Sequence, residues 1–297
     1  MPRFLKRIIR GLLRFYLTNT PVRKGRYPLM MLFHKYVSEP ITVEVSTKDR
    51  GTMVLDLEDL MQYPVYYNIF EAQYEACIKA ILANAHVILD VGANIGQYAL
   101  YFASKGKKVY AFEPMPSMIA KLEQHIRMNH FEEKITLVTK ALTSENATLK
   151  FSLPKSENSG TASLVLGRSQ NTDEIIEVEG IMLDTLVATG VIKEPVDLIK
   201  IDIEGAELFA LQGMKELLAK EHKPVLILEM NEDMMNLAGY HPDDILKFLA
   251  PFGYKAYELT KKGFRGPDER VQSLSENYAF LTEQHLAYGA INRLVYL

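Results

Sequence analysis

The stretch HVILDVGANIG, residues 86–96, decides the fold that this sequence predicts. Residues 87–91 are apolar except for Asp90, and such a run without alternation is typical of a central strand in a parallel sheet covered on both faces. Gly92 and Gly96 follow, so the backbone can turn sharply and a ligand can approach where a Cβ would collide. A helix then begins, and its first N–H groups have no partner within it. The stretch therefore predicts a strand, a glycine turn and a helix around a ligand crevice.

The spacing in this turn discriminates between nucleotide ligands. A dinucleotide turn has the pattern G-x-G-x-x-G, but Asn94 and Gln97 stand at its second and third glycines, which disfavours NAD. The next predicted strand ends at Glu113, near the spacing from Asp90 at which an acid binds an adenosine ribose. A ligand with adenosine but no pyrophosphate fits this pattern, and S-adenosylmethionine is the commonest such cofactor. The alternative is a glycine turn that serves only as a tight connection.

Four segments, in this order, carry a family resemblance: DVGANIGQYAL (90–100), AFEPMP (111–116), KALTSENATLKF (140–151) and LIKIDIEGAELFALQG (198–213). They resemble the FkbM family of S-adenosylmethionine-dependent methyltransferases, and the last segment is the most specific. The resemblance implies O-methylation of sugars, glycolipids or polyketide-type hydroxyls without fixing the acceptor.

Two residues enter the predicted cofactor site through the resemblance alone. Family members have an acidic residue where Glu71 stands and line the adenine with the segment that begins at Ala141. For Glu71 the alternative is a solvated helix face. The predicted cofactor-binding set is Glu71, Asp90, Gly92, Asn94, Gly96, Glu113 and Ala141.

Length and composition narrow the remaining classes. The chain has 297 residues and a formal net charge of −3, so it has no overall positive charge to attract nucleic acid. Its one cysteine, Cys77, cannot form an internal disulfide, which favours a reducing compartment. No apolar run approaches the roughly 18 residues that span a bilayer, and we find no secretion signal. These observations predict a cytoplasmic protein that binds no nucleic acid.

Residues 3–17, RFLKRIIRGLLRFYL, predict a basic amphipathic helix. Such a helix can lie in the surface of an anionic membrane, or it can pack on its own domain or a partner subunit. Peripheral membrane contact through residues 3–17 would suit a lipid-linked glycan acceptor. The apolar face comprises Phe4, Ile8, Ile9, Leu12, Phe15 and Tyr16, and the basic face Lys6, Arg7, Arg10 and Arg14.

Three parts are predicted along the chain. Residues 1–36 comprise the basic helix and a linker punctuated by Pro and Gly. Residues 37–70 form a small cap with a β-hairpin that turns at 49–51. Residues 71–297 form the S-adenosylmethionine-binding methyltransferase domain.

The predicted fold class is α/β, with a doubly wound, mostly parallel, seven-stranded sheet of the Rossmann-like methyltransferase type and an N-terminal helical and hairpin cap. The last two strands are joined without a helix, which suggests an antiparallel final pair that most dehydrogenase sheets lack. Short strands at 148–153, 161–166 and 175–182 form an insertion that could shape the acceptor wall. The core strands are predicted at 87–91, 109–114, 135–140, 196–202, 224–229, 254–259 and 277–282.

Strand-end carboxylates supply the predicted chemistry. Ligands of a doubly wound sheet bind at the carboxyl ends of its strands, so Asp90, Glu113, Asp202 and Glu229 should converge on one crevice. A sulfonium methyl needs mainly alignment with the acceptor, but an alcohol must also lose its proton. We predict Asp202 or Glu204 as the general base, with Glu229 orienting the acceptor hydroxyls.

Other catalytic groups are weaker candidates. Asp202 and Glu204 could hold Mg²⁺ against vicinal hydroxyls, but two carboxylates are few for this ion, and we predict no metal. Among the histidines only His241 follows a strand end near the acidic crevice, which makes it an outsider for the base.

Three other functions stay open at this point. The broken glycine pattern disfavours an oxidoreductase, and the intact strand-end carboxylates argue against a non-catalytic cofactor-binding protein. A methyltransferase acting on protein or RNA is the remaining alternative. RNA would call for basic and aromatic residues near the crevice, whereas the basic cluster lies at the N-terminal end.

Overall fold

The computed structural model of the protein describes residues 2–19, 25–37, 41–153, 163–164, 174–268 and 276–297. Its centre is a nine-stranded mixed sheet in the order β15-β13-β12-β14-β11-β10-β3-β4-β5. The strands from β11 to β5 are parallel. The pairs β11–β14, β14–β12 and β12–β13 are antiparallel, and β15 pairs in parallel with β13. The bounds are β3 Val87–Val91, β4 Lys108–Phe112, β5 Ile135–Val138, β10 Leu198–Ile201, β11 Val225–Met230, β12 Lys255–Leu259, β13 Phe264–Asp268, β14 Glu276–Leu281 and β15 Val295–Tyr296.

The doubly wound, mostly parallel fold and the antiparallel end of the sheet are confirmed, and all seven predicted strands lie in the sheet. The strand number was too low. The missed strands, β13 and β15, form the edge beyond β12, and β13 lies between the last two predicted strands, in a connection for which we predicted no helix and no strand. Phe264 and Gly266 of that strand are buried, but the polar residues around them hide this pattern in the sequence.

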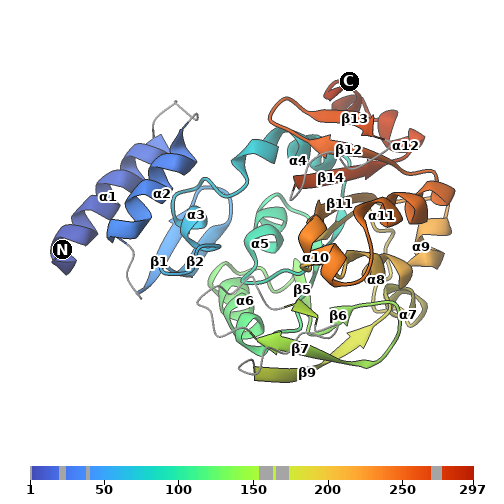
Figure 1. Ribbon diagram of the computed structural model, residues 1–297, viewed down its shortest axis with the longest axis horizontal. Helices are drawn as coiled ribbons and strands as arrows, with labels where there is room; N and C mark the ends of the chain where they lie inside the picture. The colour runs from blue at the N-terminus through green and yellow to red at the C-terminus, as the bar shows by residue number, and fades with distance from the viewer. Residues whose placement is uncertain (1, 20–24, 38–40, 154–162, 165–173, 269–275) are drawn as a thin grey trace.

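Helices cover both faces of the sheet (Figure 1). Two apolar clusters fill the space between helices and strands, one on each face. The first cluster also includes Leu17, Leu55 and Tyr63 from the N-terminal part of the chain. The helices of the body are α4 Glu75–Leu82, α5 Gln97–Ser104, α6 Pro116–Met128, α7 Leu183–Ala188, α8 Glu207–Gln212, α9 Lys215–Ala219, α10 Glu232–Leu237, α11 Pro242–Leu249, α12 Glu283–Leu286 and α13 Gly289–Asn292, with 3₁₀ turns η1 Ala72–Tyr74 and η2 Ala250–Phe252.

A second, smaller sheet stands beside the crevice, in the order β6-β9-β7-β8. It contains the predicted insertion, although of the strand expected at 161–166 the structure describes only residues 163–164. Its strands are β6 Ala141–Leu142, β7 Thr148–Leu153, β8 Ser163–Leu164 and β9 Glu174–Ile181.

The hairpin predicted near the N-terminus is confirmed as β1 Thr42–Thr47 and β2 Gly51–Asp56, which are paired along their whole length. Side chains at the C-terminal end of α6 hold the hairpin in place through hydrogen bonds to the backbone of β2, at the edge where a third strand could otherwise pair. Asn129 accepts from the Thr52 amide and donates to the Thr52 carbonyl, both at 2.7 Å. His125 accepts from Val54 N at 2.9 Å and donates from Nδ1 to the Ile95 carbonyl at 2.7 Å, so the hairpin is tied to the glycine turn.

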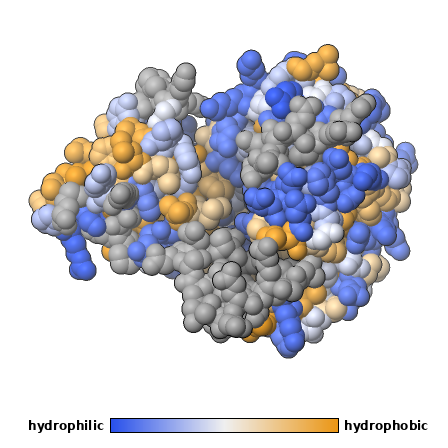
Figure 2. Space-filling view, in the orientation of Figure 1, coloured by the Kyte–Doolittle hydropathy of each residue, from blue (hydrophilic) through white to orange (hydrophobic). Residues whose placement is uncertain are grey.

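Before the hairpin, α1 Arg3–Asn19 and α2 Arg26–Val37 pack on one another and project from the body (Figure 1). Hydrophobic side chains gather over this pair in Figure 2. A short helix, α3 Tyr63–Tyr66, joins the hairpin to the body. None of the helices in the described ranges is both long enough and apolar enough to cross a bilayer.

Candidate active site

The glycine turn follows β3 and is wedged between the ends of β4 and β10, the two strands that flank β3. Gly92 N and Ala93 N donate to the Phe112 carbonyl at 3.0 and 2.9 Å, which fastens the turn to the end of β4. On its other side, a Cβ added to Gly92 would lie 1.9 Å from the backbone oxygen of Asp202, and the residue has a φ of +82°. Only glycine fits this close approach in the left-handed region without strain.

The turn ends at Gly96, directly before α5. Gly96 has a φ of +94°, and a Cβ there would lie 2.5 Å from Leu122 Cδ1. Asn94 is also left-handed, with a φ of +51°. This conformation points the Asn94 amide toward the neighbouring strand end.

The Glu113 carboxylate accepts a hydrogen bond from that amide. Its two carboxylate oxygens accept from Asn94 N at 2.8 Å and from Met115 N at 2.9 Å, so backbone groups on both sides of the crevice fix its orientation. Only 5% of the residue is exposed. Burial raises the pKa of Glu113 to about 7 despite these two hydrogen bonds.

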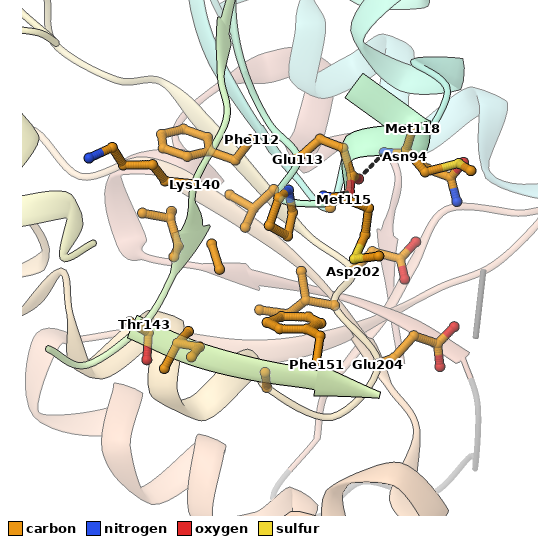
Figure 3. A pocket seen from close by; sticks show the side chains of 18 residues that line it. Asn94, Phe112, Glu113, Met115, Met118, Lys140, Thr143, Phe151, Asp202 and Glu204 are labelled. Carbon is orange, nitrogen blue, oxygen red and sulfur yellow. Dashed lines mark hydrogen bonds between the residues drawn. The ribbon is translucent and has the colours of Figure 1, made fainter. Parts of the chain in front are cut away.

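A pocket of about 730 Å³, including its open mouth, lies directly beyond this carboxylate. Figure 3 shows Glu113 at its upper wall, with Phe151 of β7 facing it across the space and Asp202 and Glu204 together on one side. The small sheet closes the opposite wall through Ala141 and Thr143. The apolar residues that line the pocket include Phe112, Met115, Met118, Leu142, Leu149 and Phe151.

Six of the ten residues predicted for the site line this pocket: Gly92, Asn94, Glu113, Ala141, Asp202 and Glu204. Glu71, Asp90, Gly96 and Glu229 lie outside the lining. Asp90 is only 1% exposed, and its Oδ2 has no hydrogen-bond partner among the described residues. Burial raises the pKa of Asp90 to about 6. The strand-end acids therefore do not all meet in one crevice, because Asp90 lies beneath it.

A second group of charged side chains adjoins the pocket, and its centre is a residue that the sequence analysis overlooked. Lys200 is 3% exposed and lies 2.8 Å from Asp202 Oδ2, on the same face of β10 as Asp202. Its Nζ also stands 4.5 Å from the centre of the Tyr98 ring, and the Tyr98 hydroxyl donates to Glu71. Burial alone would lower the pKa of Lys200, but the carboxylates of Asp202, Glu71 and Asp90 raise it above its usual value.

The signal for Lys200 was present in the sequence. A lysine inside the apolar strand LIKI has to be buried, and a buried ammonium needs an anionic partner. Lys200 stands two residues before Asp202, and alternate residues of a strand share a face. The spacing therefore indicates Asp202 as the anionic partner.

Three carboxyl groups converge on the open side of Lys200. One oxygen each from Asp202, Glu204 and Glu229 lies within 4.8 Å of the others. Glu204 lies in a turn, with a φ of +53°, and α8 begins only at Glu207. We refer to Lys200, Asp202, Glu204 and Glu229 as the charged cluster.

The pKa values of the three acids are pushed apart. Burial opposes ionisation of Asp202, but the Lys200 ammonium outweighs it and lowers the pKa of Asp202. Burial and the nearby charges of Asp202 and Glu204 raise the pKa of Glu229 well above its usual range. Burial, then Asp202, raises the pKa of Glu204 to about 7. Near neutral pH, Asp202 is therefore ionised, Glu229 is protonated and hydrogen-bonded to Asp202, and Glu204 is close to its midpoint.

Two neighbouring groups serve the local structure instead. Glu207 is 1% exposed, accepts from the amides of Ile203 and Gly205 at 3.1 and 3.2 Å, and receives the Tyr240 hydroxyl at 3.1 Å. His241 is exposed and caps α11 while its Nε2 lies 3.0 Å from Glu232. This geometry gives His241 no contact with the charged cluster.

The site thus joins a largely apolar pocket, with the Glu113 carboxylate at its wall, to a group of acids with separated pKa values. The carboxylates of Asp202, Glu204 and Glu229 are the described residues that could hold a cation. Asp202 and Glu204 line the pocket and also belong to the group of acids. A ligand that extends out of the pocket would therefore contact one of these carboxylates. Pairs of acids whose environments separate their pKa values are suited to proton transfer.

Comparison with known proteins gives a family match. Residues 90–256 match the model of the Methyltransferase FkbM domain. The hexuronic acid methyltransferase AglP of Haloferax volcanii is 28% identical over 176 residues, which are 58% of this chain and 66% of that protein. Methyltransferase sdnD of Sordaria araneosa is 27% identical over 156 residues, covering 43% of this chain and 60% of that protein.

Among solved structures, the methyltransferase FkbM of Methylobacillus flagellatus KT aligns with 66% of this chain and 44% of its own, at 20% identity and a TM-score of 0.41. The chain therefore spans less than two thirds of each of these three proteins.

Proposed function

This chain belongs to the FkbM methyltransferase family, and from that premise we propose that it transfers a methyl group from S-adenosylmethionine to a hydroxyl of a sugar, glycolipid or related acceptor. One observation carries the proposal. Asp202 and Glu204 line the pocket and also belong to the charged cluster, so the same two carboxylates border the cofactor space and the acceptor space. The relative AglP, named as a hexuronic acid methyltransferase, supports a sugar acceptor.

The pocket fits S-adenosylmethionine by its shape and chemistry. Phe112, Met118 and Phe151 offer apolar walls for an adenine ring, and Glu113 keeps lone pairs that could accept from two ribose hydroxyls. The missing Cβ of Gly92 lets the backbone of Asp202 come close to the glycine turn, so that Gly92 and Asp202 line the same pocket. When bound, the cofactor supplies a methyl group on a sulfonium, whose departure leaves a neutral thioether.

Among the acids of the cluster, Glu204 is the best general base. A base works best when its pKa is near the operating pH, and the pKa of Glu204 is about 7. Asp202 is a weaker base, because the nearby Lys200 ammonium lowers the pKa of its carboxyl group. We assign Asp202 and the protonated Glu229 to binding the acceptor, whose hydroxyls would donate hydrogen bonds to the Asp202 carboxylate and to the Glu229 carbonyl oxygen, because the Glu229 proton lies in the hydrogen bond to Asp202. Glu204 then removes the proton of the reacting hydroxyl.

The test separates cofactor binding from turnover. Calorimetric titration with S-adenosylhomocysteine, with NAD as the control ligand, should show binding of the former alone. Methyl transfer from labelled S-adenosylmethionine to methyl glucuronoside should then rise with pH through about 7, because Glu204 must be ionised to accept a proton.

Glu204→Gln should lower kcat by about 10²- to 10⁴-fold and remove this pH limb, while S-adenosylhomocysteine still binds. Glu216→Gln, an equivalent change at an exposed position, is the matched control and should change neither quantity. Wild-type turnover and an intact pH limb in Glu204→Gln would exclude Glu204 as the base. Binding of neither ligand by folded wild-type protein would overturn the proposed function itself.

A further inference from the structure

The helix pair α1–α2 faces the body with its less apolar side. Arg10, Leu13 and Leu17 are the buried residues of α1, whereas most of the apolar face that the periodicity predicts is exposed. Phe4 is 75% exposed, Leu12 65% and Phe15 70%. Together with Ile8 they form one stripe along the helix, because residues three and four apart share a face. We call Phe4, Ile8, Leu12 and Phe15 the outer stripe.

Polar contacts fix this orientation. The Arg10 guanidinium donates to the carbonyl of Val37, the last residue of α2, at 3.0 Å, which satisfies a carbonyl that the helix end leaves without a partner. Arg14 donates to the carbonyl of Ser46 in β1 at 2.8 Å and stacks 4.8 Å from the centre of the Tyr66 ring. These contacts hold the inner side of α1 against α2 and the hairpin, so the helix cannot bury its outer stripe by rolling over.

Large apolar side chains are also exposed on α2, where Leu32 is 62% exposed and Tyr36 60%. Figure 2 shows hydrophobic residues gathered over the helix pair, at the end of the molecule that projects from the body. Exposed apolar side chains scattered singly are ordinary, but a continuous apolar surface marks an interaction site.

Charge indicates what this surface meets. Residues 1–40 contain nine Lys and Arg and one Glu, which leaves 25 basic and 36 acidic residues for the remainder of the chain. Arg3 and Arg7 are exposed on α1, beside the outer stripe rather than within it. A stripe of Phe, Ile and Leu on a helix with basic residues beside it is the pattern of helices that lie in an anionic membrane surface.

We propose that the outer stripe of α1 inserts into the surface of an anionic membrane, with Arg3 and Arg7 reaching its lipid headgroups. The proposal does not rest on the proposed catalytic activity. Two copies of the chain are a poorer occupant, because a symmetric contact through this helix pair would bring two strongly basic segments together.

Sedimentation with vesicles tests the proposal on the full chain. The protein should pellet with vesicles of phosphatidylcholine and phosphatidylglycerol, but at least tenfold less with phosphatidylcholine alone, and added salt should weaken the binding. Leu12→Ser/Phe15→Ser should reduce binding by more than about tenfold, since both side chains would bury their apolar surface in the lipid. Arg3→Gln/Arg7→Gln should reduce it by up to about 30-fold, at roughly fivefold for each charge near the surface.

Matched variants at exposed positions elsewhere are the controls. Val191→Ser/Leu237→Ser and Lys193→Gln/Lys262→Gln should bind as the wild type does. The thermal unfolding of all four variants should be unchanged, because none of these side chains is buried. Equal binding to both vesicle types would overturn the electrostatic part of the proposal. Failure to bind vesicles, with a dimer in light scattering that Leu12→Ser/Phe15→Ser dissociates, would assign the stripe to contact between copies.

Discussion

Two acids at strand ends on either side of the glycine turn, Glu113 and Asp202, are held in opposite ways. Backbone amides of Asn94 and Met115 hold Glu113, and they cannot lose or gain a proton. Side chains hold Asp202, namely the Lys200 ammonium and the Glu229 carboxyl, which can. The orientation of Glu113 therefore depends on the fold of the turn, whereas that of Asp202 depends on the charge of its neighbours.

This difference matches the two tasks that we propose. A cofactor site has to present the same geometry in every turnover, and amides of a rigid turn provide it. A site that moves a proton needs acids whose charge can change, and the charged cluster provides those. The following variants should therefore affect the two sides differently.

Replacing the cation of the cluster should have the largest effect. Lys200→Met keeps most of the side-chain volume but leaves Asp202, Asp90 and Glu71 without their compensating charge. Removing one partner of a buried ion pair costs about 3 to 5 kcal/mol in the free energy of unfolding. Without the ammonium, the pKa of Asp202 would no longer be lowered, and those of Asp90 and Glu71 would rise further above their values in the unfolded chain, so the stability of the variant should fall as pH rises above about 4.

Chemical denaturation at acidic and at alkaline pH measures this effect, and the loss should be larger at alkaline pH. Lys247→Met is the control, because Lys247 forms an exposed ion pair with Asp244 at 2.9 Å, and no measurable loss is expected there. Equal losses in the two variants would mean that Lys200 does not hold the cluster together.

Gly92→Ala tests the close contact between the glycine turn and Asp202, which joins the proposed cofactor site to the charged cluster. The added Cβ would meet the backbone oxygen of Asp202 at 1.9 Å and force the turn away from β10. We expect a loss of about 3 kcal/mol in unfolding free energy, from the left-handed backbone and the clash together. Gly106→Ala is the matched control, since Gly106 has a φ of +76° with nothing within 4 Å of its Cβ, and it should lose only about 1 kcal/mol. Similar losses at both positions would show that the close approach at Gly92 is relaxed in solution.

Glu113→Ala should weaken cofactor binding and should also lower the free energy of unfolding, because it leaves two amides unpaired. The substitution removes an acceptor for the ribose and leaves the amides of Asn94 and Met115 without their partner. Hydrogen bonds to a charged group contribute about 1.5 to 3 kcal/mol, so the Kd for S-adenosylhomocysteine should rise by roughly 10- to 150-fold. Calorimetry measures this change, and Glu123→Ala on the exposed side of α6 is the control. Unchanged affinity in Glu113→Ala would place the ribose elsewhere.

The sequence predicted the parts of this molecule that depend on local pattern. Buried strands, glycines in the left-handed region and the hairpin each have a short-range signal, and all of them were found near their predicted residues. The strand-end rule also brought Asp202 and Glu229 together, because it needs only the direction of the strands.

What escaped prediction depends on contacts between distant segments. The orientation of α1 is set by Arg10 and Arg14, which bind carbonyls of α2 and β1, and helix periodicity alone cannot show which side such contacts favour. The burial of Asp90 depends on α5 and Lys200 lying over it, and the turn at Glu204 depends on Glu207 binding its amides. Lys200 is different, since its charge within an apolar strand was visible.

Metal removal should have the smallest effect. It tests whether Lys200 or a bound cation balances the negative charge of the charged cluster. Three carboxylates within 4.8 Å could hold a divalent cation, but Lys200 already lies 2.8 Å from Asp202, and the raised pKa of Glu229 keeps a proton between it and Asp202. We therefore expect EDTA followed by dialysis to change methyl transfer by less than about twofold, which is below 0.5 kcal/mol. Glu229→Gln makes the test sharper, because an amide can still donate to Asp202 but is a poorer ligand for a cation. Activity that EDTA abolishes and Mg²⁺ restores in the wild type, and that Mg²⁺ cannot restore in Glu229→Gln, would show that a bound ion shares the work assigned here to Lys200.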